Sequence, residues 1–171
     1  MPNGLFHLAT VLSRGLIAVC SALLAAMTVI VATLVFTRYI FNYSFPWAEE
    51  LTRYLMIWMV MFAAPVIQYR NDNIRVEFII QYAPSRLQGI VYLVHRVLII
   101  GFSAILAYYG WIQALNMDIT KSPTLGISMT IPFLTVPVGG VLLVLFSLLN
   151  LYDDLREIAG KPRLQTDRVE Y

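Results

Sequence analysis

Long stretches without charged residues recur four times along the chain. Because an α-helix needs about 20 apolar residues to cross the hydrocarbon core of a bilayer, three of these stretches are long enough to span it directly. The second, 54–69, has only 16 residues, so we expect its helix to begin near Trp47 and to carry its first charged residues in the headgroup layer. The pattern predicts an all-α integral membrane protein with four transmembrane helices, at about 15–38, 47–69, 96–117 and 131–152.

The connection between the second and third spans, about 74–95, shows a different pattern. Ser85 follows Pro84, and Gln88 three residues later completes a capping box that opens a helix. Apolar residues then occupy one helical face and polar residues the opposite one, which indicates an amphipathic helix. This helix either lies flat at the cytoplasmic interface or extends the third span, and we expect it to be bent or tilted. The apolar face holds Leu87, Ile90, Val91 and Val94, and the polar face holds Arg86, Gln88 and His95.

The composition favours a membrane protein and excludes several other classes. Hydrophobic residues make up 59% of the 171 residues and charged residues 13%, with a mean hydropathy of +0.72, whereas a soluble domain carries about 25% charged residues. The net charge of +2 is too small for a nucleic-acid-binding protein. Cys20 is the only cysteine, which excludes disulfide frameworks and cysteine-based metal clusters. The first span exceeds the apolar length of a signal peptide, so we expect it to remain as a helix.

The lysines and arginines divide unevenly between the two sides of the predicted membrane domain. With four crossings, the N-terminal segment, the second-to-third connection and the C-terminal tail, 153–171, share one side and hold nine of these cations. The opposite side holds three, Arg38, Arg53 and Lys121. Since positively charged segments stay in the cytoplasm, both termini are predicted to be cytoplasmic.

The spans lack the residues that transport or redox chemistry requires. Ion-coupled carriers place ionisable groups or broken helices near the membrane midplane, but the first, third and fourth spans contain no such group in their central parts. His7 and His95 lie at the edges of spans, so paired haem ligands inside the membrane are not expected. We therefore predict no catalytic, metal or cofactor site, and we expect neither an enzyme nor a carrier that works alone.

Two of the spans carry rows of small residues at helical spacing. In lipid, small side chains let the backbones of neighbouring helices approach closely. These two stripes either pack within the four-helix unit or dock onto a larger membrane protein. The first stripe consists of Ala18, Ala22 and Ala26, and the second of Ser103, Ala107, Gly110 and Ala114.

Two motifs resemble segments of a known family. Within 38–54, the run Trp47-Ala48-Glu49-Glu50-Leu51-Thr52-Arg53 looks like the Trp-x-Glu-Glu-x-x-Arg segment of the small membrane subunit of tripartite ATP-independent periplasmic (TRAP) transporters. The segment 122–129, which contains Pro123 and Leu125-Gly126-Ile127, is similar to the family's Pro-x-Leu-Gly-Ile segment before the last helix. Together with the spacing of the four spans, the resemblance covers about 15–154.

The resemblance implies a division of labour within a bacterial inner membrane. In such transporters a periplasmic solute-binding protein delivers the solute, a large permease subunit carries the substrate and sodium sites, and the small subunit acts as a scaffold. Family substrates are mostly carboxylates. We therefore expect a non-transporting, multi-pass scaffold subunit of a sodium-coupled importer, whose partners are the large subunit, the binding protein and membrane lipids. The alternative is a structural anchor in another membrane complex, such as a redox assembly.

The external ends of the spans hold charged and aromatic residues on which the loaded binding protein could dock. Glu49 and Glu50 lie four and three residues before Arg53, so these three residues could instead pair along one helix or at a subunit interface. The candidate docking and interface residues are Arg38, Trp47, Glu49, Glu50, Arg53, Asp118 and Lys121.

Overall fold

The computed structural model describes residues 2–70 and 85–158, which are helical apart from short connections. Each helix contains its predicted span, except that residue 117 lies just beyond the third. The part of the predicted amphipathic connection before residue 85 and the predicted tail beyond residue 158 lie outside the described residues. The helices are α1 (Pro2–Ile40), α2 (Pro46–Arg70), α4 (Ser85–Asn116) and α5 (Thr130–Ile158).

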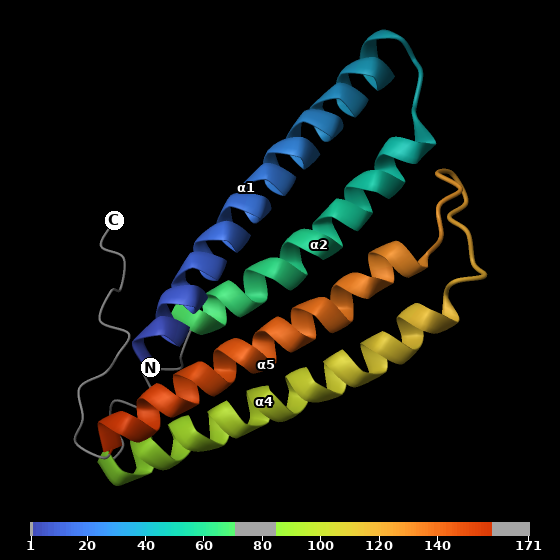
Figure 1. The fold of residues 1–171 in the computed structure, drawn as a ribbon. Coiled ribbons are helices and arrows are strands. Elements are labelled where there is room, and N and C mark those ends of the chain that lie inside the picture. Colours follow the sequence, from blue (N-terminus) through green and yellow to red (C-terminus); the bar gives the residue numbers. More distant parts are fainter. Residues whose placement is uncertain (1, 71–84, 159–171) are drawn as a thin grey trace.

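The four helices lie side by side in the order α1, α2, α5, α4, as two antiparallel hairpins (Figure 1). The inner helices α2 and α5 run in the same direction and pack against each other. We call the end that holds the starts of α1 and α4 the terminal end. The opposite end, which holds the connections 41–45 and 117–129, is the loop end. In this arrangement α2 and α5 are central, and α1 and α4 lie at the two edges.

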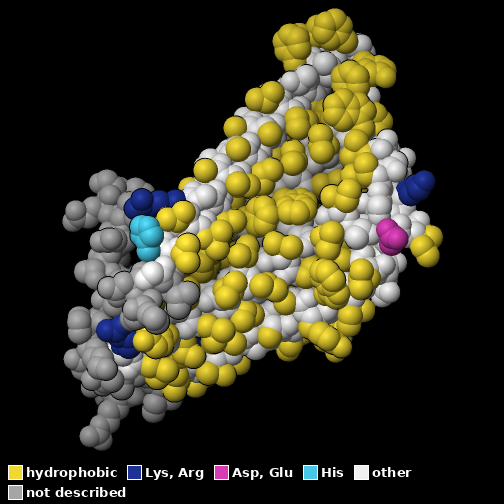
Figure 2. All heavy atoms as spheres, viewed as in Figure 1, with side chains coloured by type: hydrophobic (Ala, Val, Ile, Leu, Met, Phe, Trp, Pro, Cys, Tyr) yellow, Lys and Arg dark blue, Asp and Glu magenta, His cyan; other side chains and the backbone are white. Residues whose placement is uncertain are grey.

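All four helices are long and apolar enough to cross a membrane. Figure 2 shows apolar side chains spread over the middle of the visible face, whereas lysine, arginine, acidic and histidine side chains lie toward its two ends. This distribution is the one that a hydrocarbon layer between two aqueous sides requires. The structure therefore confirms the predicted all-α membrane fold with four spans, and the cytoplasmic placement of the termini stays a prediction.

The first helix begins well before the predicted start of its span. Phe6, Ala9, Ser13 and Leu16 are buried and follow one another at intervals of three and four residues, so they form one face of a helix. The hydroxyl groups of Thr10 and Tyr69 are 2.9 Å apart and hydrogen bonded, which joins this face to α2. The apolar stripe continues through the polar N-terminal residues, and α1 therefore extends upstream of residue 15.

Helix α4 begins at Ser85, where the capping-box pattern predicted a start. It continues without a break for 32 residues to Asn116, or about 48 Å, which exceeds the thickness of the hydrocarbon core. Within the described residues, the amphipathic connection thus extends the third span as one continuous helix. Arg96 is buried and donates a hydrogen bond from Nε to Asp154 Oδ2 at 2.9 Å, which holds α4 against α5.

The contact between α2 and α5 depends on a proline and a glycine. Pro65 has no N–H group, so the carbonyl of Met61 loses its usual partner within α2. Gly139 of α5 packs against this carbonyl so closely that a Cβ atom there would lie 2.8 Å from the Met61 oxygen. Any side chain at position 139 would therefore push the two central helices apart.

The contact between α4 and α5 also depends on glycines that let the two helices approach closely. A Cβ atom on Gly110 would lie 2.8 Å from Val136 Cγ1, and one on Gly140 would lie 2.9 Å from the backbone nitrogen of Ala107. Ser103 and Ala114 are buried on the same side of α4. The second small-residue stripe therefore faces α5, within the described helices. The members of the first stripe, in contrast, are exposed along α1: Ala18, Ala22 and Ala26.

Candidate functional site at the loop end

The carboxylate of Glu50 joins α2 to the connection between α4 and α5. Its Oε1 accepts hydrogen bonds from the hydroxyl of Tyr54, one turn along α2, and from Ser122 Oγ at 2.6 Å. Its Oε2 accepts bonds from the Thr124 hydroxyl and from the Thr124 backbone N–H at 3.1 Å. A carboxylate can accept about four hydrogen bonds, and the Glu50 carboxylate therefore uses its full capacity. We call Glu50, Tyr54, Ser122 and Thr124 the Glu50 cluster.

The connection itself is folded as a small hairpin. Lys121 and Ser128 form an antiparallel bridge, and Ser122 N–H donates to the Ile127 carbonyl at 2.8 Å. Gly126 lies between them with φ of 68°, a left-handed conformation that glycine adopts without strain. This turn directs Ser122 toward Glu50 and leaves Ile119 94% exposed. The turn of the hairpin is therefore bonded to α2, whereas Ile119, nearer its base, is exposed.

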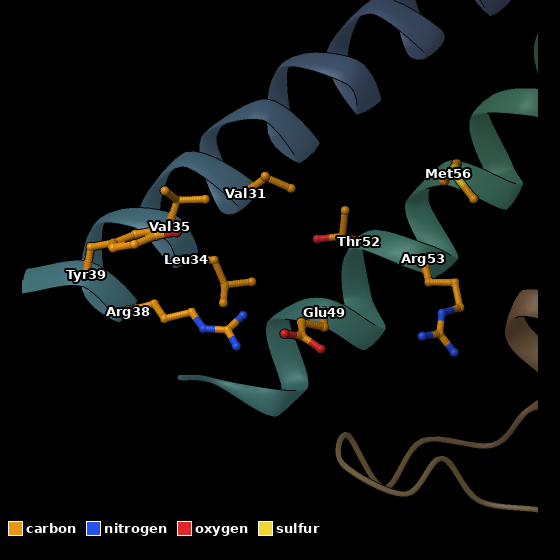
Figure 3. A pocket seen from close by; sticks show the side chains of 9 residues that line it. All are labelled: Val31, Leu34, Val35, Arg38, Tyr39, Glu49, Thr52, Arg53 and Met56. Atoms are coloured by element: carbon orange, nitrogen blue, oxygen red, sulfur yellow. The ribbon is translucent and has the colours of Figure 1, made fainter. Parts of the chain in front are cut away.

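A groove of about 500 Å³ separates α1 from α2 at the loop end (Figure 3). Val31 and Leu34 extend from α1 toward α2, and Thr52 extends from α2 toward α1. Arg38 and Glu49 lie toward the connection between the two helices, whereas the Arg53 side chain extends on the other side of α2, away from α1 (Figure 3). The lining residues are Val31, Leu34, Val35, Arg38, Tyr39, Glu49, Thr52, Arg53 and Met56.

The pairing of Glu49 or Glu50 with Arg53 along α2 is not formed within the described residues, where the ion pair is Arg96–Asp154 near the other end. The hydroxyl groups of Ser122 and Thr124 occupy the Glu50 carboxylate instead. Helical spacing indicated which residues of α2 were neighbours, but it carried no information on a hairpin more than 70 residues away. The Ser122-Pro123-Thr124 run, with its two hydroxyl groups, was the available signal for these missed partners.

The remaining candidate docking residues are also at the loop end. Arg38 is exposed in the last turn of α1, and Asp118 and Lys121 are exposed in the hairpin. Trp47 is 45% exposed at the start of α2 and lies next to Phe45, with their ring centroids 5.9 Å apart. The structure thus gathers the predicted residues at one end, but on two surfaces: the groove and the hairpin.

These features define a class of protein. Four apolar helices lie in one layer, charged groups gather at the ends, and the described residues contain no group of His, Cys, Asp or Glu that could hold a metal ion. The molecule is a multi-pass helical membrane protein. Its described surface presents broad apolar areas along the helices and two polar surfaces at the loop end.

A family model for the DctQ component of tripartite ATP-independent periplasmic transporters matches residues 27–157, which is more than half of the chain. The chain therefore belongs to this family of small TRAP permease subunits and is a transporter subunit. This membership confirms the resemblance carried by the Trp47–Arg53 motif, and it separates the chain from the redox anchors considered as an alternative.

Individual relatives show the same likeness. The isethionate TRAP transporter permease protein DctMQ of Oleidesulfovibrio alaskensis is 29% identical over 69% of this chain and 18% of its own length. The C4-dicarboxylate TRAP transporter small permease protein DctQ of Vibrio cholerae is 34% identical over 52% of this chain and 38% of its own. The chain therefore spans less than half of these two relatives. The sialic acid TRAP transporter small permease protein SiaQ of Vibrio cholerae is 24% identical over 81% of this chain and 80% of its own length.

Proposed function

We propose that this chain is the non-transporting small subunit of a sodium-coupled TRAP importer in a bacterial inner membrane, where it scaffolds a large permease subunit. A periplasmic binding protein delivers the solute, which is an organic anion and most simply a carboxylate. Family membership supports the role of a transporter subunit. The names of the relatives, which refer to isethionate, C4-dicarboxylate and sialic acid, support an organic anion as the solute.

The observation that carries this proposal is the uncharged interior of the membrane helices. Coupling solute movement to sodium requires oxygen ligands or ionisable groups at membrane depth. The ion pair Arg96–Asp154 lies toward the terminal end, and the Glu50 cluster lies in the second turn of α2 at the loop end. Between these levels the central parts of α1, α4 and α5 have no Asp, Glu, Lys, Arg or His. The coupling chemistry therefore belongs to a partner.

The shape of the molecule supports a bracing role. A single layer of helices has two broad faces, and many large apolar side chains on them are exposed, among them Phe102, Tyr108 and Trp111 on α4. Such a layer offers a wide, rigid apolar surface to another membrane protein. The exposed stripe on α1, with Ala22 at its centre, is the first candidate for that contact, because the α4 stripe already faces α5.

Reconstitution into sealed vesicles tests the proposal. Vesicles holding this chain alone, the large subunit alone, or both are given a sodium gradient, the cognate binding protein and radiolabelled organic anions. We expect uptake only when both subunits are present, and only with the gradient imposed. Sodium-driven uptake by this chain alone would overturn the scaffold role, and full uptake by the large subunit alone would show that no brace is required.

The orientation of the chain is tested separately by labelling from outside the cell. In a Cys20→Ala background, Ile119→Cys at the loop end should react with an impermeant maleimide, whereas a cysteine at position 165 in the tail should react only after the membrane is opened. The reverse pattern would place the termini in the periplasm. Position 119 is chosen because Ile119 is 94% exposed, whereas the hydroxyl groups of Ser122 and Ser128 are engaged in hydrogen bonds.

A further inference from the structure

The groove between α1 and α2 is lined at its outer part by two opposite charges. Figure 3 shows the Arg38 guanidinium group extending from the last turn of α1 toward the first turn of α2, which carries Glu49. Both side chains are exposed, and neither forms an ion pair within the described residues. The two groups therefore present one positive and one negative charge to a molecule that occupies the groove.

The nearby charged residues do not change this balance. The Arg53 side chain leaves α2 on the side away from α1 and from Arg38 (Figure 3). Glu50 does not contribute either, because the hydroxyl groups of its cluster already bond to its carboxylate. The charge pair of Arg38 and Glu49 thus has a direction but no net charge. A ligand that complements it carries an anionic and a cationic group close together.

The part of the groove further from the helix ends is apolar. Val31 and Leu34 extend from α1 toward α2 (Figure 3), and Met56 of α2 also lines the groove. Val31 is 44% exposed and Met56 47% exposed, so the groove is open beside them within the described residues. These residues belong to the parts of α1 and α2 that are long and apolar enough to cross a membrane. A ligand held by the charge pair therefore needs an apolar tail.

Exposed aromatic side chains indicate the depth of the charge pair in the membrane. In membrane proteins such rings gather at the level of the lipid headgroups. The charge pair therefore lies at headgroup depth, and the apolar part of the groove lies in the hydrocarbon. The aromatic residues near this end of α1 and α2 are Tyr39, Phe41, Tyr43 and Trp47.

We propose that the groove between α1 and α2 binds one zwitterionic phospholipid of the phosphatidylethanolamine type. Its phosphate accepts hydrogen bonds from the guanidinium group of Arg38, whose planar donors suit phosphate oxygens. Its ammonium group donates to the carboxylate of Glu49, and one acyl chain lies along Val31 and Leu34. An ammonium N–H is required, and the trimethylammonium group of phosphatidylcholine has none. The bound lipid thereby joins α1 to α2 at the loop end.

Native mass spectrometry of the full chain, purified in detergent, tests the headgroup preference. Phosphatidylethanolamine, phosphatidylcholine and phosphatidylglycerol are added in equal amounts. The second lipid has a cationic group without N–H donors, and the third has no cationic group. We expect one phosphatidylethanolamine per chain and about fivefold weaker retention of the other two lipids. Equal retention of all three, or a preference for phosphatidylglycerol, would overturn the proposal.

Substitution of each charge tests the assigned contacts. Glu49→Gln removes the partner of the ammonium group but keeps Arg38, so phosphatidylglycerol should then be retained as well as phosphatidylethanolamine. Arg38→Gln removes the partner of the phosphate and should weaken the retention of phosphatidylethanolamine about fivefold. Arg53→Gln is the matched control, because its side chain extends away from α1, and it should change neither result. An unchanged lipid preference in Glu49→Gln, or equal losses in Arg38→Gln and Arg53→Gln, would contradict these contacts.

A second pair of variants tests the apolar part of the groove. Val31→Trp fills this part and should abolish the retention of phosphatidylethanolamine, whereas Val29→Trp, at an exposed position on α1 outside the groove, should not. The unfolding midpoint of each variant, measured without added lipid, shows that the helices still pack. Glycerophosphoethanolamine, which has the headgroup without acyl chains, should not displace the lipid at equal concentration. Its displacement of the lipid, or full retention in Val31→Trp, would overturn the proposal.

Discussion

The terminal end and the loop end of the molecule are held together in different ways. At the terminal end, each neighbouring pair of helices is joined by a side-chain hydrogen bond: Thr10–Tyr69 joins α1 to α2, Asn150 to the Gln68 carbonyl joins α2 to α5, and Arg96–Asp154 joins α4 to α5. The buried cluster that contains Leu16, Val66, Tyr69 and Phe146 lies among them. At this end, hydrogen bonds join every neighbouring pair of the four described helices.

At the loop end, the described side-chain hydrogen bonds between elements join α2 to the hairpin, and none of those described joins α1 to α2. The Glu50 cluster attaches the hairpin to α2, while α1 and α2 leave a groove between them. Hydrogen bonds engage Thr10, Arg96 and Asn150 at the terminal end. At the loop end, the charged side chains of Arg38, Arg53, Asp118 and Lys121 are exposed. The difference suits the terminal end to maintaining the layer of helices, and recognition at the loop end stays a proposal.

The largest expected effect comes from the seam between the two central helices. Gly139→Leu places a side chain against the Met61 carbonyl, where a Cβ atom alone would be 2.8 Å from the oxygen. We expect a loss of more than about 3 kcal/mol, because the backbone and not a flexible side chain must move. Thermal unfolding in detergent, followed by tryptophan fluorescence, measures it. Gly101→Leu is the control, since a Cβ atom at position 101 meets nothing within 4 Å. Equal destabilisation by both variants would show that the α2–α5 contact does not require glycine at position 139.

A smaller loss of stability is expected when the terminal end alone is opened. Asp154→Asn removes the carboxylate that faces the buried Arg96. We expect about 2 kcal/mol of destabilisation, between the values of exposed and fully buried ion pairs, because Asp154 is 29% exposed. The same unfolding assay applies. Asp118→Asn, which alters an exposed acid of the loop end, is the control and should leave the midpoint temperature of unfolding unchanged. If it lowered the midpoint as much as Asp154→Asn does, the terminal end would not be the more important for stability.

Breaking the Glu50 cluster should release the hairpin without opening the helices. Glu50→Ala removes the acceptor of Ser122 and Thr124, and we expect a global destabilisation of only about 1 kcal/mol. Reactivity of a cysteine placed at Leu125, in the Cys20→Ala background, should rise at the same time. Glu49→Ala, the neighbouring exposed acid, is the control and should change neither quantity. Unchanged cysteine reactivity in Glu50→Ala would show that the hairpin is held by other contacts.

The smallest expected effect concerns docking of the binding protein. Reversing one exposed hairpin charge, in Asp118→Lys or Lys121→Glu, should lower solute uptake several-fold at limiting binding protein and little when it is abundant, because surface charge acts mainly on the encounter rate. Raising the salt concentration should reduce the difference from the unaltered chain. If neither reversal changes solute uptake at any concentration of binding protein, the hairpin is not part of the docking surface.

Much of the fold could be predicted from the sequence because the bilayer imposes a simple rule on it. A segment that crosses hydrocarbon must be apolar for about 20 residues and must satisfy its own backbone hydrogen bonds. The four spans, the capping box at Ser85 and the Trp47–Arg53 motif all belong to local patterns of this kind. The upstream extension of α1 was missed, although Phe6, Ala9, Ser13 and Leu16 carried a helical spacing.

The contacts between distant segments required the tertiary structure. Glutamates three and four residues from an arginine indicated a pair along α2, yet Glu50 bonds to a hairpin that lies beyond α4 in the chain. Likewise, two similar stripes of small residues could not be told apart until the layer order placed one against α5 and left the other exposed on α1.

By itself, the sequence determined that this protein is a four-helix membrane subunit of the TRAP type, because span length, charge and short motifs are local properties of the chain. Only the tertiary structure decided which side chains meet across helices, that hydrogen bonds join each neighbouring pair of helices at the terminal end, and that an apolar groove opens between α1 and α2. The physical reason is that helix spacing relates residues within one element, whereas the partner of a buried or charged group is set by how the elements pack.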